Sequence, residues 1–184
     1  IRRGLHVSAL RLQPDGTSAL DLHPAFSPPG NTFTLQPPTT LLALNGLTGS
    51  LIGNAQVERT PNDIIVTEPI VGPLPTCPIH AESGYIYARP LPARQILVGG
   101  GRHWPDLTPT DREERLLAWL ARAIPAAAQV RPAMRWTGYL GVGPTKQTRI
   151  EAIAAHTFGA WRLGGIGVAT GMEVGRELAY LSRK

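Results

Sequence analysis

The feature of this sequence that most constrains its fold is a glycine-rich run near the C-terminal end. Within twelve residues the run contains five glycines: Gly164, Gly165, Gly167, Gly171 and Gly175. A backbone that lacks Cβ atoms where it enters a helix can approach a flat or anionic group closely. A dinucleotide-binding turn also requires a second strand that carries an acidic residue about 20 residues later. Only thirteen residues follow Gly171, so we expect this helix start to serve a purpose other than phosphate binding.

The last helix is predicted over residues 167–181, and Gly167, Gly171 and Gly175 recur at every fourth residue along one of its stripes. Each glycine costs about 1 kcal/mol relative to alanine inside a helix, so three of them need a reason. One interpretation is close packing of the helix against a sheet. The other is a ligand at the helix N-terminus, where unpaired N–H groups and the positive end of the helix dipole attract electron-rich groups. The two interpretations are compatible if the first glycines face the ligand and Gly175 faces the sheet.

Arg162 lies just before the glycine run and is a candidate for the same site. Its planar guanidinium fits a carboxylate with two hydrogen bonds, although a surface arginine is equally compatible with the sequence. Lys146 lies in a glycine-containing turn but lacks the residue order of a phosphate-binding loop. The five histidines show no metal-ligand spacing, so we expect no metal site.

The composition is that of a globular chain of 184 residues, of which 42% are hydrophobic and 17% charged. No apolar run approaches the roughly 20 residues of a membrane span, so we expect no membrane partner. The net charge is +5, but the arginines are scattered singly, which favours a basic solvated surface over a nucleic-acid partner. The single cysteine, Cys77, cannot form an internal disulfide. This usage is typical of a reducing compartment and predicts a cytoplasmic location.

The order of elements predicts an α+β fold in which strands outnumber helices. Alternating or continuous apolar residues bounded by turn residues predict strands at residues 5–12, 18–22, 39–46, 64–67, 85–89, 96–99 and 130–140. The proline-broken segment 24–38 is predicted to be a loop or hairpin. A surface helix is predicted over residues 110–123, with a capping box at Thr110 and Glu113. Segment 39–46 is apolar without alternation, so we expect a central strand buried on both faces.

Several segments, in order along the chain, resemble motifs of the D-amino-acid-oxidase-like superfamily of FAD-dependent oxidoreductases, in particular the members that oxidise glycine and sarcosine. Residues 41–48 resemble the family's "vvlAtNaytg" strand and turn, and residues 59–69 resemble the segment that opens its substrate domain. Residues 85–101 resemble its "YyR…illGG" hairpin. Residues 135–138 resemble "rWtG", and residues 161–168 resemble the closing flavin-binding loop. Together these segments extend over nearly the whole chain.

The resemblance implies a fold, a cofactor and a set of contacts. The implied fold is an antiparallel or mixed substrate-domain sheet beside a remnant of a Rossmann-like FAD-binding domain, from an α/β parent. The residues implied to contact FAD are Gly164, Gly165, Ile166, Gly167, Val168, Ala169, Trp136 and Gly138. Arg162, Tyr87 and Arg89 are implied to hold a small amine or amino-acid substrate. The implied chemistry is hydride transfer to the flavin from a carbon beside an amine nitrogen, followed by hydrolysis of the imine.

The resemblance also implies a division of the chain. Residues 1–58 would belong to the FAD-binding domain, residues 59–135 would form the substrate domain with one surface helix, and residues 136–184 would return to the FAD-binding domain.

Two departures from the family pattern lead to further expectations. The family's first strand with its GxGxxG turn is not in the sequence, and Leu140 stands where some members carry a substrate-binding arginine. We therefore expect that the N-terminal FAD-binding segment is missing or is supplied by another chain. We also expect this chain alone to be inactive and to self-associate through uncovered apolar surface. The alternative function is a non-catalytic β-rich module that binds a partner.

Overall fold

The computed structural model describes residues 2–26 and 30–183, which form two units. The first unit comprises the residues up to Arg59 and those from Leu140 onward, and the second comprises residues 60–139. Helices occur together with antiparallel and mixed sheets, which confirms the predicted α+β fold class. The assignment of residues 1–58 and 136–184 to FAD binding, and of residues 59–135 to substrate binding, stays a prediction.

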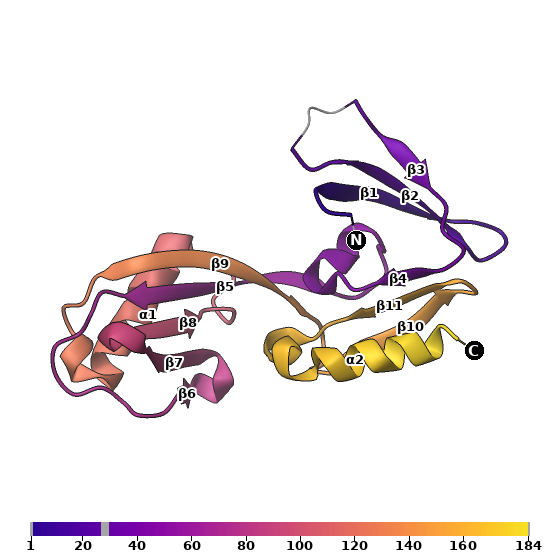
Figure 1. The fold of residues 1–184 in the computed structure, drawn as a ribbon. Helices are drawn as coiled ribbons and strands as arrows, with labels where there is room; N and C mark the ends of the chain where they lie inside the picture. The colour runs from indigo at the N-terminus through magenta and orange to yellow at the C-terminus, as the bar shows by residue number, and fades with distance from the viewer. Residues whose placement is uncertain (1, 27–29, 184) are drawn as a thin grey trace. The chain divides into compact units, whose positions relative to one another are not determined.

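The first unit begins with a small antiparallel sheet in the order β1-β2-β3 (Figure 1). Its strands are β1 (Leu5–Leu12), β2 (Ser18–Pro24) and β3 (Phe33–Leu35). The strands predicted at residues 5–12 and 18–22 are therefore confirmed. Because β2 and β3 pair antiparallel, the segment predicted as a loop or hairpin contributes a strand; its residues 27–29 lie outside the described residues.

Asp21 on β2 accepts hydrogen bonds from both neighbouring strands. Arg11 on β1 donates from Nη2 to Oδ1 over 2.7 Å and pairs with Oδ2 through Nη1, and Thr34 on β3 donates to Oδ1 over 2.8 Å. These bonds, first of all the one from Arg11, lower the pKa of Asp21 from 3.8 to about 2. The carboxylate form is thus the one that the folded state favours.

This depressed pKa predicts an acid-dependent contribution to stability. A carboxyl group with a lowered folded-state pKa stabilises the fold above its unfolded-state pKa, and the contribution is lost as the pH falls through the folded-state value. We expect the difference in urea midpoint between the wild type and Asp21→Asn to be full above about pH 5 and to shrink as the pH approaches 2. Urea unfolding at a series of pH values measures this difference, and a difference that stays constant down to that pH would contradict the prediction.

The rest of the first unit is a three-stranded mixed sheet packed against α2 (Gly167–Leu181), which begins and ends where the sequence predicts. The sheet has the order β10-β11-β4, with β10 (Arg149–Ala154) antiparallel to β11 (Thr157–Trp161) and β4 (Thr40–Leu42) parallel to β11. Figure 1 shows α2 lying along β10 and β11. The buried residues of this interface are Phe158, Ala160 and Leu178, with Ile150, Val174 and Leu181 packed against them.

The prediction of a long, doubly buried strand over residues 39–46 is wrong. Only β4 is a strand, Leu41 within it is 47% exposed, and Asn45–Ser50 form the 3₁₀ helix η1. Leu44 is already outside the extended region at φ −101° and ψ −7°, and Asn45 follows in a left-handed conformation at φ +47°, so residues 44–46 cannot continue a strand.

The expectation that Gly175 faces the sheet is also wrong. A Cβ atom at Gly175 or at Gly171 would meet no atom within 4 Å. The side of α2 that packs on the sheet carries larger residues, among them Leu178. Close packing on this sheet therefore does not explain the glycine stripe: Gly171 and Gly175 border open space, and Gly167 lies against the side chain of Leu163.

The uncovered surface of the first unit supports the prediction of self-association. Among the described residues β4 is an edge strand of its sheet, and the apolar side chains of Val168 and Met172 are 103% and 88% exposed. Unpaired strand edges and clustered apolar side chains favour association. We expect the purified chain to form oligomers whose mass rises with concentration in light scattering. A monomer across the whole concentration range would contradict this.

The second unit is built on a five-stranded sheet in the order β6-β7-β8-β5-β9. The strands are β5 (Glu58–Thr67), β6 (Ile79–Ala81), β7 (Ile86–Leu91), β8 (Gln95–Gly100) and β9 (Pro132–Val142). β7 and β8 are adjacent and antiparallel, with Tyr87 opposite Gly99. This confirms the prediction that segments 85–89 and 96–99 are neighbouring strands.

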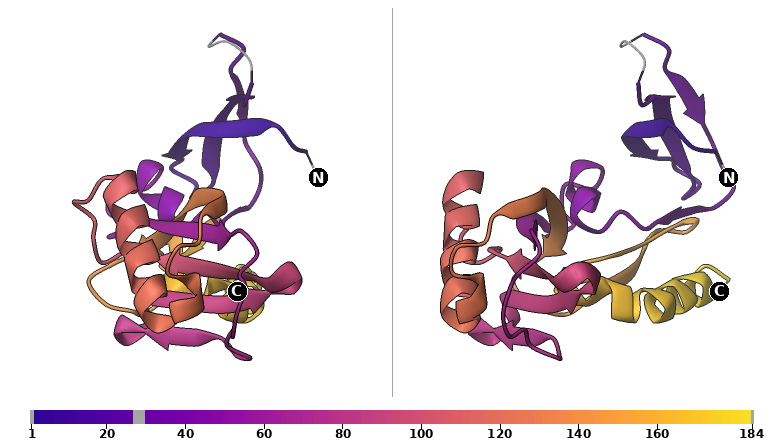
Figure 2. Two further views of the ribbon diagram at one scale, coloured as in Figure 1. Left: turned by 90° about the vertical axis from the view of Figure 1, so that its left-hand side faces the viewer. Right: turned by 60° about the vertical axis from the view of Figure 1, so that its left-hand side comes forward.

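Helix α1 (Pro109–Ala123) lies against one face of this sheet (Figure 2). Its apolar stripe packs on alternate residues of the central strands, and the fully buried members include Leu116, Leu120, Ile96 and Val98. The helix is the one predicted, but the capping box at Thr110 and Glu113 is wrong. The N-cap is Thr108, whose Oγ1 accepts from the N–H of Asp111 over 3.2 Å while the Asp111 carboxylate accepts from the Thr108 N–H. The helix starts earlier than predicted because Pro109 suits its first position.

Candidate functional site

The glycine loop of the first unit leads directly into α2. Residues Gly164–Ile166 form the 3₁₀ turn η5, and Gly164 has φ +56° with no atom within 4 Å of the position of a Cβ. No side chain caps the N-terminus of α2, and its first turn contains no acidic residue. Ile166 is 60% exposed and Val168 is fully exposed. The start of α2 is thus an open surface of backbone N–H groups beside apolar side chains.

The entry to the glycine loop is held by Asn45, a residue that the sequence analysis placed near the end of the strand predicted over residues 39–46. Its side-chain oxygen Oδ1 accepts a hydrogen bond from the backbone N–H of Leu163 over 3.1 Å. Gly141 on β9 allows this contact, because a Cβ atom there would lie 2.5 Å from the same oxygen. Asn45 therefore links the end of β4 to the first residue of the glycine loop. The left-handed conformation of Asn45 was the available sequence signal, since asparagine followed by glycine favours it.

Removing this link is expected to loosen the glycine loop. In Asn45→Gly the positive φ is retained without strain, so the variant isolates the loss of the hydrogen bond. We expect it to lower the free energy of unfolding by about 1 kcal/mol, the net contribution of one partly buried hydrogen bond. Urea unfolding measures the change.

A matched control is Ser182→Ala, which removes a side-chain bond to the carbonyl of Ala179 at the far end of α2. We expect that control to change the stability by no more than about 0.5 kcal/mol. Equal effects of the two substitutions would show that Asn45 has no special role.

The structure gives Arg162 a contact within its own unit. The residue is only 5% exposed and has φ +64°. Its Nη2 donates to both the carbonyl oxygen and Oγ1 of Thr145, each over 2.7 Å. Its Nε is buried without a hydrogen-bond partner, and a Cβ atom at Gly143 would lie 2.3 Å from it. The guanidinium therefore braces the turn around Thr145, and its predicted contact with a substrate carboxylate stays a prediction.

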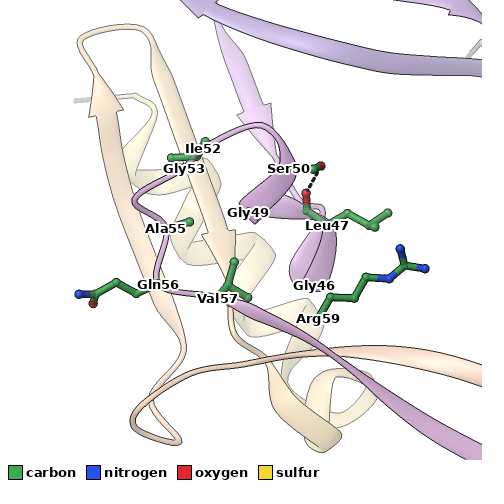
Figure 3. Close-up of a pocket in the computed structure, with 10 residues that line it drawn as sticks. All are labelled: Gly46, Leu47, Gly49, Ser50, Ile52, Gly53, Ala55, Gln56, Val57 and Arg59. Carbon is green, nitrogen blue, oxygen red and sulfur yellow. Dashed lines mark hydrogen bonds between the residues drawn. The ribbon is translucent and has the colours of Figure 1, made fainter. Parts of the chain in front are cut away.

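A shallow cavity of about 320 Å³ lies in the first unit around η1 (Figure 3). Glycines supply part of its wall, and the side chain of Arg59 contributes a positive charge at one end. The lining residues are Gly46, Leu47, Gly49, Ser50, Ile52, Gly53, Ala55, Gln56, Val57 and Arg59. Because Asn45 is the first residue of η1, this cavity adjoins the same chain segment that holds the entry to the glycine loop.

In the second unit, four predicted site residues lie on the sheet face that α1 leaves uncovered. Tyr87 and Arg89 are two residues apart on β7, so their side chains point to the same side. Trp136 and Gly138 are likewise two residues apart on β9. A Cβ atom at Gly138 would lie 3.9 Å from Cδ1 of Ile64. Ile64 pairs with Gly99, which in turn lies opposite Tyr87.

The other predicted residues, Arg162 and residues 164–169, belong to the first unit. The predicted site residues therefore fall into two groups, one within each unit.

The sequence analysis missed two residues beside Tyr87 and a buried ion pair behind the sheet. Asn62 donates from Nδ2 to the Tyr87 hydroxyl oxygen over 3.3 Å, and Gly99 lies beneath the Tyr87 ring. On the opposite face, Arg112 of α1 pairs through Nε with Asp63 of β5. The side chains of this pair are 6% and 9% exposed.

Two classes of site are not found among residues 2–26 and 30–183. No group of three His, Cys, Asp or Glu side chains there could hold a metal ion. No helix in the described part of the chain has the length and apolar character needed to cross a membrane.

The fold resembles those of several solved flavoenzyme-related structures. Glycine oxidase from Geobacillus kaustophilus matches with a TM-score of 0.74 at 17% identity, over 97% of this chain and 48% of that protein. L-proline dehydrogenase from P. horikoshii matches with a TM-score of 0.65 at 19% identity, over 96% and 49%. Iminodiacetate oxidase from Chelativorans sp. BNC1 matches with a TM-score of 0.66 at 13% identity, over 93% and 47%. The chain thus spans about half the length of these proteins, and at such identities the likeness establishes the fold alone.

The comparison with curated proteins finds no significant match. The family model described as FAD dependent oxidoreductase matches residues 29–181, which is most of the chain. This match confirms the resemblance inferred from the motifs, and FAD is the cofactor of that family. The chain therefore belongs to the family of FAD dependent oxidoreductases.

Proposed function

We propose that the protein containing this chain oxidises a small amine or amino acid, with FAD as the acceptor of the hydride. The single observation that carries the proposal is the open glycine loop at the uncapped start of α2, in a chain of this family. The relatives in structure are named for glycine, iminodiacetate and L-proline, all of which carry a carboxylate and an amine. The proposed substrate belongs to this class.

The residues of the glycine loop fit a flat, largely apolar ring that becomes negative on reduction. Gly164 leaves room where a side chain would otherwise stand, and Ile166 and Val168 expose apolar surface beside it. The unpaired N–H groups at the start of α2 and the dipole of the helix favour negative charge. We propose that residues 164–169 contact the flavin ring, and that Trp136 and Gly138 also contact FAD.

The residues of the second unit are proposed to bind and orient the substrate. The Tyr87 hydroxyl and the exposed Arg89 guanidinium share one sheet face, and both can donate hydrogen bonds to a carboxylate. Bound FAD supplies the chemistry, by accepting a hydride from the carbon beside the amine nitrogen. The protein groups hold that carbon in place and exclude competing orientations. Arg162 contributes indirectly, since it braces the turn at Thr145.

The proposal is tested by steady-state assays on the full-length, FAD-loaded protein with glycine, L-proline and iminodiacetate. The matched control substrate is glycolate, which replaces the amine of glycine by a hydroxyl group. We expect turnover of at least one amine with release of a carbonyl product, and none of glycolate. A protein that carries FAD but turns over none of these amines would contradict the proposed substrate class. A full-length protein that retains no flavin would favour the alternative, a non-catalytic binding module.

Two remaining expectations belong with this proposal. We propose that the isolated chain is inactive, because the segment with the GxGxxG turn is not part of it. A cytoplasmic location also stays a proposal, and it rests on the single cysteine, Cys77, which is exposed.

A further inference from the structure

We infer that Asn62 and Gly99 are positioning residues that hold the Tyr87 hydroxyl so that its proton points to a hydrogen-bond acceptor of the substrate. This inference rests on the proposed function and adds to it the two residues that orient Tyr87. Both residues lie in segments that resemble family motifs, 59–69 and 85–101, but neither was predicted as a site residue. Both lie within the second unit, on the sheet face that α1 does not cover.

Gly99 provides the space in which the Tyr87 ring lies. The two residues are opposite each other on the antiparallel strands β8 and β7. A Cβ atom at Gly99 would lie 2.5 Å from both Cζ and the hydroxyl oxygen of Tyr87. No real Cβ atom can approach so closely. The ring therefore lies flat across the neighbouring strand only because residue 99 has no side chain.

Asn62 fixes the hydroxyl end of the ring. It is 8% exposed, and its Nδ2 donates to the Tyr87 oxygen over 3.3 Å. An amide N–H has no lone pair to receive a proton, so in this bond the phenol oxygen accepts and its own O–H remains available. A tyrosine that is held in this way can donate that proton only to a group outside the sheet.

The neighbouring side chains define the chemistry of that group. Arg89 lies two residues along β7 on the same face and is exposed. A neutral O–H donor beside a guanidinium suits an oxygen acceptor with negative charge, such as a carboxylate. His80 lies opposite Tyr87 on β6, with the centroids of the two rings 6.3 Å apart. A carboxylate bound beside Arg89 would therefore be a suitable acceptor for the Tyr87 proton.

The test is a double-mutant cycle on the full-length, FAD-loaded protein with acetate as the probe. Acetate offers a carboxylate but no amine, so its binding is independent of turnover. Its Kd is measured from the change that it causes in the visible absorbance of the flavin. We expect Tyr87→Phe to raise the Kd about tenfold, which is the effect of one lost hydrogen bond. Asn62→Leu, which removes the amide without adding a charge, should raise the Kd by up to the same factor, because nothing then fixes the direction of the phenolic O–H.

The double variant distinguishes a positioning role from an independent one. If Asn62 acts through Tyr87, the double variant binds acetate no more weakly than Tyr87→Phe alone. If the two residues act independently, their factors multiply to about a hundredfold, and the inference is overturned. Gly99→Ala is a second route to the same result, and it should raise the Kd as Tyr87→Phe does and add nothing to it.

Controls separate this inference from folding and from the proposed function. Gln95→Ala removes another half-buried amide donor of the same sheet, which bonds the carbonyl of Thr67 over 2.8 Å, and it should leave the Kd unchanged. The urea midpoint and the flavin content of each variant show whether it is folded and loaded. If the protein turns over none of the amines but the double-mutant cycle is still non-additive, only the proposed substrate class is contradicted. A wild type whose flavin does not respond to acetate would overturn the inference itself.

Discussion

Replacing Gly165 or Gly167 with valine is expected to lower the flavin content of the purified full-length protein about tenfold or more. Gly167 begins α2 at φ −56°, so a valine there is compatible with the backbone. A Cβ atom at Gly167 would lie 3.3 Å from Cβ of Leu163, and the added methyl groups would extend into the space beside the glycine loop that we assign to the flavin ring. Overpacking of this kind costs about 1–3 kcal/mol, and 1.4 kcal/mol corresponds to a factor of ten in binding. Flavin absorbance relative to protein absorbance measures the occupancy.

The matched control for these variants is Gly175→Ala, on the same helix and two turns further on. A Cβ atom at Gly175 meets no atom within 4 Å, and alanine is the better helix former by about 1 kcal/mol. We expect this variant to retain its flavin and to be slightly more stable than the wild type. If the valine variants keep full flavin content while folded, the glycine loop does not contact the ring.

The largest expected loss of stability is that of Arg112→Ala. Its guanidinium is buried between α1 and the sheet, where it pairs with Asp63 and also donates to the carbonyl of Leu107. The Asp63 carboxylate receives a further bond from Thr137 Oγ1 over 2.6 Å. Removing the arginine leaves this carboxylate buried without its counter-charge, which costs about 3–5 kcal/mol. Urea unfolding monitored by tryptophan fluorescence measures the loss, since Trp119 of α1 is buried in the same core.

Arg176→Ala is the control for the loss of an arginine ion pair. Arg176 pairs with Glu173 and Glu177 on the surface of α2, where its side chain is 66% exposed. Exposed pairs contribute at most about 1 kcal/mol. The double variant Arg112→Met with Asp63→Asn should recover much of the loss, because no unpaired charge is left buried. If Arg112→Ala and Arg176→Ala cost the same, the buried pair does not hold α1 on the sheet.

Local patterns in the sequence were sufficient for elements whose signals are local. Helix α2 has its predicted bounds, and the adjacent strands β7 and β8 follow from alternation and a turn between them. Near α1 two capping signals compete within a few residues, and Pro109 favours Thr108 as the N-cap over Thr110. Segment 39–46 has the composition of a buried strand. In the structure it is an edge strand followed by a 3₁₀ helix, since Leu44 is already helical and Asn45 takes a left-handed conformation.

The parts that escaped sequence analysis are contacts between residues far apart in the chain. Asn45 and Leu163 are separated by 118 positions, and Asp63 and Arg112 by 49. No spacing rule connects such residues, since only the completed sheets bring them together. The same reason explains Arg162, whose motif indicated a substrate contact while its guanidinium bonds Thr145 in its own unit. The sequence did not indicate a role for Asn62 and Gly99, because that role depends on the register of the three strands β5, β7 and β8.

Anaerobic reduction of the flavin tests most directly whether this chain completes a flavin site at which an amine is oxidised. The full-length, FAD-loaded protein is mixed with glycine, L-proline or iminodiacetate in the absence of oxygen, and the visible absorbance of the oxidised flavin is followed. The proposed function predicts that at least one of these amines bleaches the absorbance within seconds to minutes, and that glycolate does not. A flavin that remains oxidised with every amine, in a protein that dithionite reduces normally, would contradict it.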